Sequence, residues 1–168
     1  MSLTEFLSNL DNKCFSDTMT KCCASTQWVR QMTASRPFDH DEQLFAMATQ
    51  IWWSLAKDDW REAFAAHPRI GDLDSLRAKF SNTQSWASGE QSGVTGASEE
   101  TLSQLAVGND RYWKRFGYIF IVFATGKTAS EMLDILERRL DNHADDEIRI
   151  AAEEQLKITL LRLEKLVD

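Results

Sequence analysis

The sequence contains little glycine and proline: seven glycines and two prolines occur among its 168 residues. Tight turns rely on these residue types, and an all-β sandwich or barrel needs many such turns. The composition therefore argues against an all-β fold and favours helices joined by few connections. A chain of this length can bury one sizeable hydrophobic core, so we expect a single domain over residues 1–168.

Motifs of the common metal, nucleotide and serine-nucleophile sites are also absent from the sequence. It has no CxxC or HxxxH pair for zinc and no GxSxG, and Gly126-Lys127-Thr128 lacks the upstream glycine of a phosphate-binding loop. We therefore expect neither a metal nor a bound cofactor. The three cysteines, Cys14, Cys22 and Cys23, are odd in number and two are adjacent. This is not the pattern of a disulfide framework and indicates a reducing compartment.

Positive charge is in the minority, with 19 basic against 26 acidic residues and a formal net charge of −7. Nucleic acids and anionic membranes require clustered Lys and Arg, so neither is expected as a partner. Residues 1–9 are too polar for a signal peptide, no apolar run is long enough to span a membrane, and residues 166–168 do not form the SKL-type peroxisomal signal. We expect a soluble, cytoplasmic protein.

Signals for helix starts recur along the chain. Ser2 with Glu5, and Thr128 with Glu131, match the capping box, in which a hydroxyl and a carboxylate three residues apart satisfy free N–H groups of the first turn. Serine before an apolar pattern, or before acidic residues of a first turn, indicates a helix start as well. Helix N-caps are therefore predicted at Ser2, Ser16, Ser25, Ser98 and Thr128.

Apolar residues repeat at helical spacing between these signals. One such face consists of Leu44, Ala48, Ile51, Trp52 and Leu55. A helix starting near Asp58 must end near His67, because Pro68 follows it. The last helix is predicted over 145–166. Residues 118–124 are rich in β-branched and aromatic side chains, so a strand is the alternative to a helix there. We predict an all-α fold of about eight helices.

His67 has the least ordinary setting of the three histidines. It stands in Ala65-Ala66-His67-Pro68-Arg69-Ile70-Gly71-Asp72, at the end of a predicted helix and before a proline that stiffens the chain. A rigidly held imidazole suits general acid–base catalysis, because proton transfer depends first on geometry. A histidine that only caps the helix or lies in the core fits the same spacing. For His40 and His143, in acidic surroundings, an exposed structural role is favoured.

Two further clusters contain residues capable of chemistry. Residues 81–96 are rich in Ser, Thr, Gly and Gln and predict a loop, in which small residues flank the Glu90 carboxylate and the Gln91 amide. The backbone of this loop could approach a ligand closely, although a solvated loop without a ligand fits equally well. The doublet Cys22-Cys23 could hold a reactive thiol, or two buried structural cysteines.

The run from Trp60 to Asp72, with His67-Pro68-Arg69-Ile70-Gly71-Asp72 at its end, resembles the signature of the 2-oxo-4-hydroxy-4-carboxy-5-ureidoimidazoline (OHCU) decarboxylases. These enzymes catalyse the third step of urate oxidation to allantoin. The resemblance covers nearly the whole chain in order, through Cys22-Cys23 with Trp28, Arg36-Pro37-Phe38, Glu90-Gln91, Arg115-Phe116-Gly117-Tyr118, Lys157-Ile158 and Leu161-Arg162-Leu163. It implies an all-helical, homodimeric carboxy-lyase that needs no cofactor.

The resemblance also implies roles for individual residues. His67 matches the catalytic histidine, and Glu90 the acid that orients it or polarises the substrate hydroxyl. Ligands of the ureide substrate are implied at Pro68, Ala87, Ser88, Gly89, Glu90, Gln91, Phe120, Ile121, Val122, Phe123, Ala124 and Arg162. The sequence departs from the family at Ala87, where a serine is common. Either Ser88 replaces that hydroxyl or the contact is missing.

The implied reaction converts OHCU to (S)-allantoin and CO2. Two alternatives from other classes are a helical interaction module, with a Trp- and Phe-lined groove, and a related ureide hydrolase that releases no CO2. The interaction module gives no reason for the HPRIGD run, Glu90-Gln91 and Arg162 to occur together.

Overall fold

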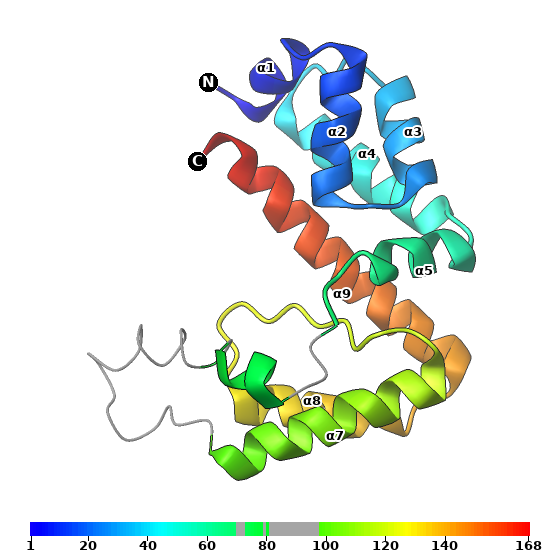
Figure 1. The fold of residues 1–168 in the computed structure, drawn as a ribbon. Coiled ribbons are helices and arrows are strands. Elements are labelled where there is room, and N and C mark those ends of the chain that lie inside the picture. The colour runs from blue at the N-terminus through cyan, green and yellow to red at the C-terminus, as the bar shows by residue number, and fades with distance from the viewer. Residues whose placement is uncertain (70–72, 79, 81–97) are drawn as a thin grey trace. The chain divides into compact units, whose positions relative to one another are not determined.

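The structure, a computed structural model, describes residues 1–69, 73–78, 80 and 98–168, and the regular secondary structure within them is helical (Figure 1). Within these residues the bounded elements are α1 (Leu3–Ser8), α2 (Asn12–Cys22), α3 (Thr26–Ala34), α4 (Asp41–Ser54), α5 (Lys57–Ala65), α7 (Glu99–Phe116), α8 (Ala129–Leu140), α9 (Ala144–Glu164) and the short 3₁₀ helix η1 (Lys165–Val167). Residues 73–78 are helical as well. The predicted all-α fold of about eight helices is confirmed.

The contacts divide the chain into two compact units. The first unit comprises residues 1–67 and 150–168, and the second comprises residues 68–149. Helix α9 contributes its first residues to the second unit and the remainder to the first. In the described part of the chain, no helix combines the length and the apolar character needed to cross a membrane.

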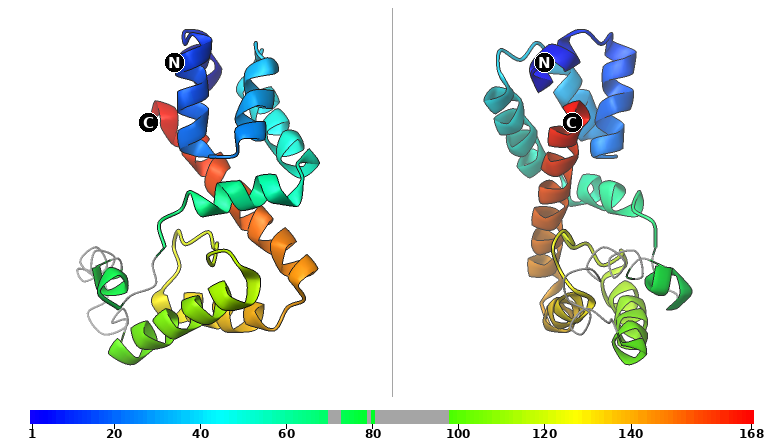
Figure 2. Two further views of the ribbon diagram at one scale, coloured as in Figure 1. Left: turned by 45° about the vertical axis from the view of Figure 1, so that its right-hand side comes forward. Right: turned by 90° about the vertical axis from the view of Figure 1, so that its left-hand side faces the viewer.

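In the first unit, α2 and α3 lie side by side and α4 packs against α3 (Figures 1 and 2). Three buried tryptophans link these helices to their neighbours, because each indole N–H donates to a backbone carbonyl. Trp28 donates to Ala48 at 3.0 Å, Trp52 to Ala152 at 2.9 Å, and Trp60 to the carbonyl of Trp52 at 2.9 Å. Each tryptophan thereby buries a large apolar ring while its indole N–H keeps a hydrogen-bond partner.

Most of the predicted helix starts are confirmed. Both capping boxes are present, and the side chains of Ser25 and Ser98 accept the N–H groups of Trp28 and Thr101. The prediction for Ser16 was wrong. Asp11 caps α2 by accepting the N–H of Cys14 at 2.7 Å, so the helix begins earlier and Ser16 lies inside it.

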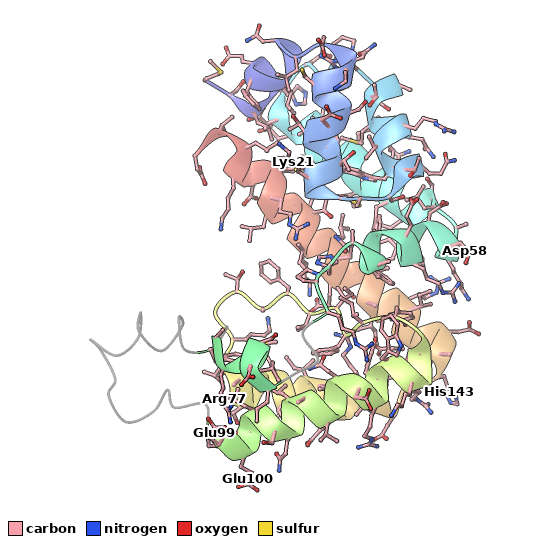
Figure 3. All side chains as sticks on the ribbon, viewed as in Figure 1. Lys21, Asp58, Arg77, Glu99, Glu100 and His143 are labelled. Carbon is pink, nitrogen blue, oxygen red and sulfur yellow. The ribbon has the colours of Figure 1, made fainter. Side chains whose placement is uncertain are left out.

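In the second unit, α7 and α8 lie side by side (Figure 2). Gly108 of α7 permits their close approach, because a Cβ atom there would lie 2.6 Å from the side chain of Leu136. The helical residues 73–78 are linked to the start of α7, since Arg77 donates to the Glu99 carboxylate at 2.7 and 3.0 Å (Figure 3).

Residues 118–124 form neither the helix nor the strand considered for them. Gly117 ends α7 in the left-handed conformation, with φ of 82°, and its N–H closes the helix on the carbonyl of Trp113 at 2.8 Å. Glycine adopts this conformation without steric cost and commonly ends helices. The apolar segment after it is therefore irregular backbone.

We expect the Trp52→Phe variant to lower the free energy of unfolding by about 2 kcal/mol, because it removes a buried hydrogen bond and leaves a cavity. Urea denaturation followed by far-ultraviolet circular dichroism measures the change. Trp53→Phe is the matched control: its residue is 41% exposed, so a loss below about 1 kcal/mol is expected. Equal losses in the two variants would contradict the structural role of the Trp52 indole.

Candidate active site

His67 lies directly after α5, where its N–H donates to the carbonyl of Phe64 at 3.2 Å. The prediction that the helix ends near His67 is thus confirmed. The ring is half-buried, and its Nε2 lies 2.5 Å from the side-chain oxygen of Gln155 on α9. The imidazole is therefore held by a buried partner, Gln155 being 1% exposed.

Gln155 is held in turn by Thr159, one helical turn further along α9. The Thr159 hydroxyl donates to the backbone carbonyl of Gln155 at 3.0 Å, and its oxygen accepts from the Gln155 side-chain N–H at 3.2 Å. This pattern directs the Gln155 side-chain oxygen at His67. An oxygen acceptor requires a proton on His67 Nε2, which leaves Nδ1 as the lone-pair nitrogen of the neutral ring.

Arg162 lies close enough to His67 for its charge to affect the imidazole. Burial lowers the pKa of His67 below its usual value; the hydrogen bond with Gln155 opposes this shift, and the Arg162 charge adds to it. The neutral ring is therefore favoured. Arg162 is an exposed residue, and its Nη1 donates to the carbonyl of Cys22 at 3.3 Å. The structure thus brings the predicted residues His67 and Arg162 together in the first unit.

The cysteine doublet beside this cluster is structural in character. Cys22 and Cys23 are each 1% exposed, and burial raises the pKa of both thiols to about 11. A protonated, buried thiol is a poor nucleophile. The interpretation of the doublet as buried structural cysteines is therefore favoured over a reactive thiol.

The predicted ligands Phe120 to Ala124 lie in the second unit, on the irregular segment between α7 and α8. Several carbonyls of this segment are already bound. Ile121 accepts from Arg139 Nη1 at 2.6 Å, Phe123 from Lys127 Nζ at 2.7 Å, and Ala124 from the Lys127 N–H at 3.0 Å. Backbone carbonyls of Ile121, Phe123 and Ala124 are therefore engaged by the protein itself.

The remaining predicted site residues are placed less fully. Pro68 is exposed and is the first residue of the second unit. The stretch predicted to contribute Ala87, Ser88, Gly89, Glu90 and Gln91 lies outside the described residues. Their roles stay predictions.

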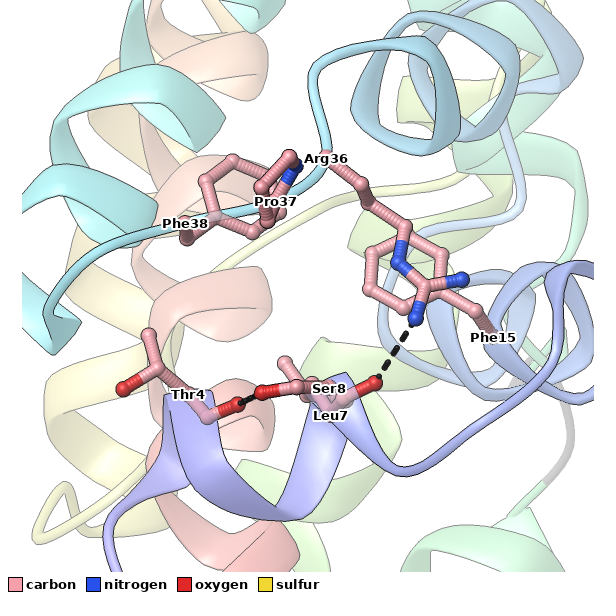
Figure 4. Close-up of a pocket in the computed structure, with 7 residues that line it drawn as sticks. All are labelled: Thr4, Leu7, Ser8, Phe15, Arg36, Pro37 and Phe38. Atoms are coloured by element: carbon pink, nitrogen blue, oxygen red, sulfur yellow. Dashed lines mark hydrogen bonds between the residues drawn. The ribbon is translucent and has the colours of Figure 1, made fainter.

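A small pocket in the first unit lies away from these predicted residues (Figure 4). Its volume is about 80 Å³, and it is lined by Thr4, Leu7, Ser8, Phe15, Arg36, Pro37 and Phe38. The guanidinium of Arg36 lies over the Phe15 ring, 4.4 Å from its centroid, and donates to the carbonyls of Leu7 and Leu10 at 3.1 and 2.6 Å. Arg36, part of the Arg36-Pro37-Phe38 motif, thus holds the end of α1, a structural role.

The other two histidines are exposed, as predicted. His40 caps α4, since its Nδ1 accepts the N–H of Gln43 at 3.2 Å. His143 lies on the surface just before α9 (Figure 3). Of the three histidines, His67 alone combines partial burial with a buried side-chain partner among the described residues.

Comparison with known proteins places this site in a family. The family model of OHCU decarboxylase matches residues 8–164. A crystal structure of an OHCU decarboxylase in the presence of (S)-allantoin is 37% identical with a TM-score of 0.72, covering 89% of this chain and 96% of that one. The chain belongs to the OHCU decarboxylase family.

Relatives of this family differ in length. The uric acid degradation bifunctional protein TTL of Arabidopsis thaliana is 39% identical over 86% of this chain, which spans 45% of the length of that protein. The OHCU decarboxylase of Haloferax volcanii is 25% identical over 94% of this chain and 91% of its own length. The chain therefore matches less than half of the length of the bifunctional relative and about nine-tenths of the length of the Haloferax volcanii decarboxylase.

Sequence reasoning did not identify Gln155 as the partner of His67. A signal for it exists: Ala151, Ala152, Gln155 and Thr159 share one face of the last helix, and all four are buried. A polar residue within an apolar helical stripe needs a hydrogen-bond partner. The pattern alone did not indicate that this partner is His67.

The bond between His67 and Gln155 predicts opposite effects of two substitutions on the pKa of His67. Gln155→Leu removes a bond that favours the protonated ring, so the pKa falls further; Gln155→Glu supplies a carboxylate, so it rises. An NMR titration of the imidazole measures both, with the His67→Gln spectrum assigning the signal. Shifts in the same direction, or none, would contradict the bond.

The lowered pKa of His67 also predicts a pH dependence of stability. Since the unfolded ring takes up its proton at higher pH than the folded one, this histidine destabilises the fold as the pH falls below about 6.5. The difference in free energy of unfolding between wild type and His67→Gln, measured from pH 8 to pH 5 in urea, isolates the contribution. A difference that does not vary with pH would be inconsistent with the lowered pKa.

Proposed function

We propose that this chain decarboxylates OHCU to (S)-allantoin and CO2 in urate degradation, without a bound cofactor. The observation that carries the proposal is the setting of His67: a half-buried imidazole that is held at Nε2 by Gln155 beside the cationic Arg162, with its pKa lowered by burial. A base next to a cation suits a substrate that carries both a carboxylate and an acidic hydroxyl.

The substrate explains why no cofactor is needed. When the bond to the carboxylate breaks, its electron pair moves into the ring, where the adjacent imine accepts it. The imine nitrogen takes up a proton from solvent and becomes an N–H group. The hydroxyl then loses its proton to become the carbonyl of allantoin, and the ureido-bearing carbon gains one. In the proposed mechanism His67 Nδ1 accepts the hydroxyl proton, and the imidazole serves as general acid–base.

Arg162 supplies the positive charge that the substrate carboxylate or carbonyl oxygen requires. A guanidinium remains charged and offers paired donors, which suits a planar anion. Arg162 is exposed, so its guanidinium is accessible to a ligand. Its Nη1 donates to the carbonyl of Cys22 at 3.3 Å. The same charge adds to the larger effect of burial in lowering the pKa of His67, which favours a neutral ring able to accept a proton.

The other roles follow from the family resemblance. Glu90 orients His67 or polarises the substrate hydroxyl, and Gln91 with the backbone of residues 120–124 binds the ureide. The proposal for residues 120–124 is supported by their irregular backbone, because a helix or strand would use its N–H groups internally.

The first test is a coupled assay with OHCU freshly generated from urate by urate oxidase and 5-hydroxyisourate hydrolase. Circular dichroism follows (S)-allantoin, and wild type is expected to accelerate its formation above the spontaneous, racemic background. His67→Ala should lower the rate by about 10²-fold or more, because it removes the acid–base group. His143→Ala, at an exposed histidine, is the matched control and should retain wild-type turnover.

Each contrary outcome has a separate meaning. A wild-type rate equal to the spontaneous background would overturn the decarboxylase function. Turnover of the ureide without release of CO2 would instead indicate a hydrolase. A His67→Ala variant with near-normal turnover would remove His67 from the mechanism while leaving the function intact.

We expect Arg162→Lys to raise KM for OHCU about tenfold or more, because a lysine lacks the paired donors that bind a carboxylate. Steady-state kinetics in the same assay measure the change. Arg149→Lys, an equally conservative change at an exposed position of α9, should leave KM unchanged. Equal KM values for Arg162→Lys and wild type would argue against carboxylate binding by Arg162.

We also propose that the chain acts as a homodimer, as a single domain over residues 1–168 and in the cytoplasm. The family resemblance supports the first two, and the three free cysteines support a reducing compartment. Light scattering coupled to size exclusion separates a monomer of 19.2 kDa from a dimer of twice that mass. A monomer at assay concentration would contradict the dimer.

A further inference from the structure

Three helices of the second unit each direct one buried polar side chain at a common point. These side chains are Tyr112 of α7, Arg139 of α8 and Glu147 of α9, with exposures of 0%, 6% and 0%. Glu147 Oε1 accepts from the Tyr112 hydroxyl at 2.5 Å and from Arg139 Nε at 2.7 Å. Its other oxygen accepts from Asn142 at 3.0 Å. Burial raises the pKa of Tyr112, so its hydroxyl remains a donor.

Arg139 has a further donor, and this one reaches the irregular segment after α7. Its Nη1 donates to the carbonyl of Ile121 at 2.6 Å, and its guanidinium carbon lies 4.6 Å from the centroid of the Phe120 ring. The Ile121 side chain is itself 2% exposed. One guanidinium therefore holds two consecutive residues, one through the backbone and one through the ring.

The neighbouring carbonyls of Phe123 and Ala124 are bound by Lys127. Within the residues that the structure describes, the backbone N–H groups of Val122 and Ala124 donate to no other residue. Both residues are only partly buried. Three carbonyls of the segment are thus bound by donors of the protein, whereas the N–H groups of Val122 and Ala124 remain for acceptors from outside.

A buried ion pair is a poor means of stabilising a helical core, because apolar side chains of similar volume often stabilise it as well or better. The pair of Arg139 and Glu147 supplies a hydrogen-bond donor to the buried carbonyl of Ile121, which apolar side chains could not do. The planar guanidinium sets the direction of this bond. This points to control of backbone geometry rather than to stability alone.

We propose that Arg139 is a positioning residue for substrate binding: held by Glu147, it fixes the Ile121 carbonyl so that the N–H groups of Val122 and Ala124 are available to the acceptor oxygens of the ureide. The proposal rests on the proposed function, because it assigns this backbone to the substrate. Arg139 itself does not contact the reacting atoms.

The test is Arg139→Lys in the coupled OHCU assay. Lysine keeps a positive charge for Glu147 but has no planar fork that could bind Glu147 and Ile121 together. KM for OHCU should rise about tenfold or more, whereas kcat at saturation should stay within about threefold, because His67 is unchanged. The Kd of (S)-allantoin, measured by calorimetry, should weaken in parallel with KM.

Tyr112→Phe is the matched control for a purely structural role. It removes one donor to Glu147 and the long 3.4 Å bond from Arg139 Nη2, and it leaves the bonds from Arg139 to Glu147 and to the Ile121 carbonyl in place. It should lower Tm while leaving KM at the wild-type value. An unchanged KM in Arg139→Lys would overturn the proposal. So would a rise in KM in Tyr112→Phe equal to that in Arg139→Lys.

A measurement on wild type keeps the proposal testable if Arg139→Lys does not fold. In a titration of ¹⁵N-labelled protein with (S)-allantoin, the amide signals of Val122 and Ala124 should shift with saturation. Unshifted signals at saturation would overturn the proposal. A wild type without decarboxylase activity would overturn the proposed function. An active wild type, with unchanged KM in Arg139→Lys, would overturn only the role of Arg139.

Discussion

One hydrogen bond, between His67 Nε2 and the side-chain oxygen of Gln155, links the end of α5 to α9 and sets the protonation pattern of the imidazole. A buried amide must satisfy both its donor and its acceptor, and here Thr159 takes the first and His67 the second. If the Gln155 amide were rotated by half a turn, its N–H groups would face the His67 ring and its oxygen would face the Thr159 hydroxyl. The proton of that hydroxyl is already donated to the Gln155 backbone carbonyl. The geometry of α9 therefore determines which nitrogen of His67 carries the lone pair.

The neutral state of His67 depends on burial and on the charge of Arg162, with burial the larger cause. Both effects disfavour an imidazolium, whereas the hydrogen bond with Gln155 favours it. A general base needs this balance, because a ring that is already protonated cannot accept the substrate proton. In the proposed mechanism, the same arginine that contributes to the lowered pKa of His67 also supplies the charge that binds the anionic substrate. Both effects follow from the position of Arg162 on α9.

The second unit uses a related arrangement around Arg139. There a buried polar group again originates on a helix and holds a residue that lies outside regular structure: Ile121 in this case, as Gln155 holds His67 in the first unit. In both places a side chain on a helix fixes the position of a residue that lies outside the helices. The cost of burying the charge of Arg139 is offset by Glu147, which makes the pair neutral within the core.

The order and ends of the helices were determined largely by local sequence. Capping at Ser2 and Thr128 and the stop before Pro68 are readable because each depends on neighbours a few residues away. The local sequence also singled out His67 as the candidate histidine, while leaving a structural role open. The cap predicted at Ser16 was wrong because Asp11, earlier in the chain, caps the same helix. The helix or strand considered for residues 118–124 was wrong as well: Gly117 ends α7 in the left-handed conformation, and irregular backbone follows.

Only the tertiary structure decided that Gln155 meets His67, 88 residues away, and that Arg139 holds Ile121. The physical reason is that a hydrogen bond between distant residues depends on how helices pack. Helical periodicity in one sequence specifies which face is buried but not which partner that face meets.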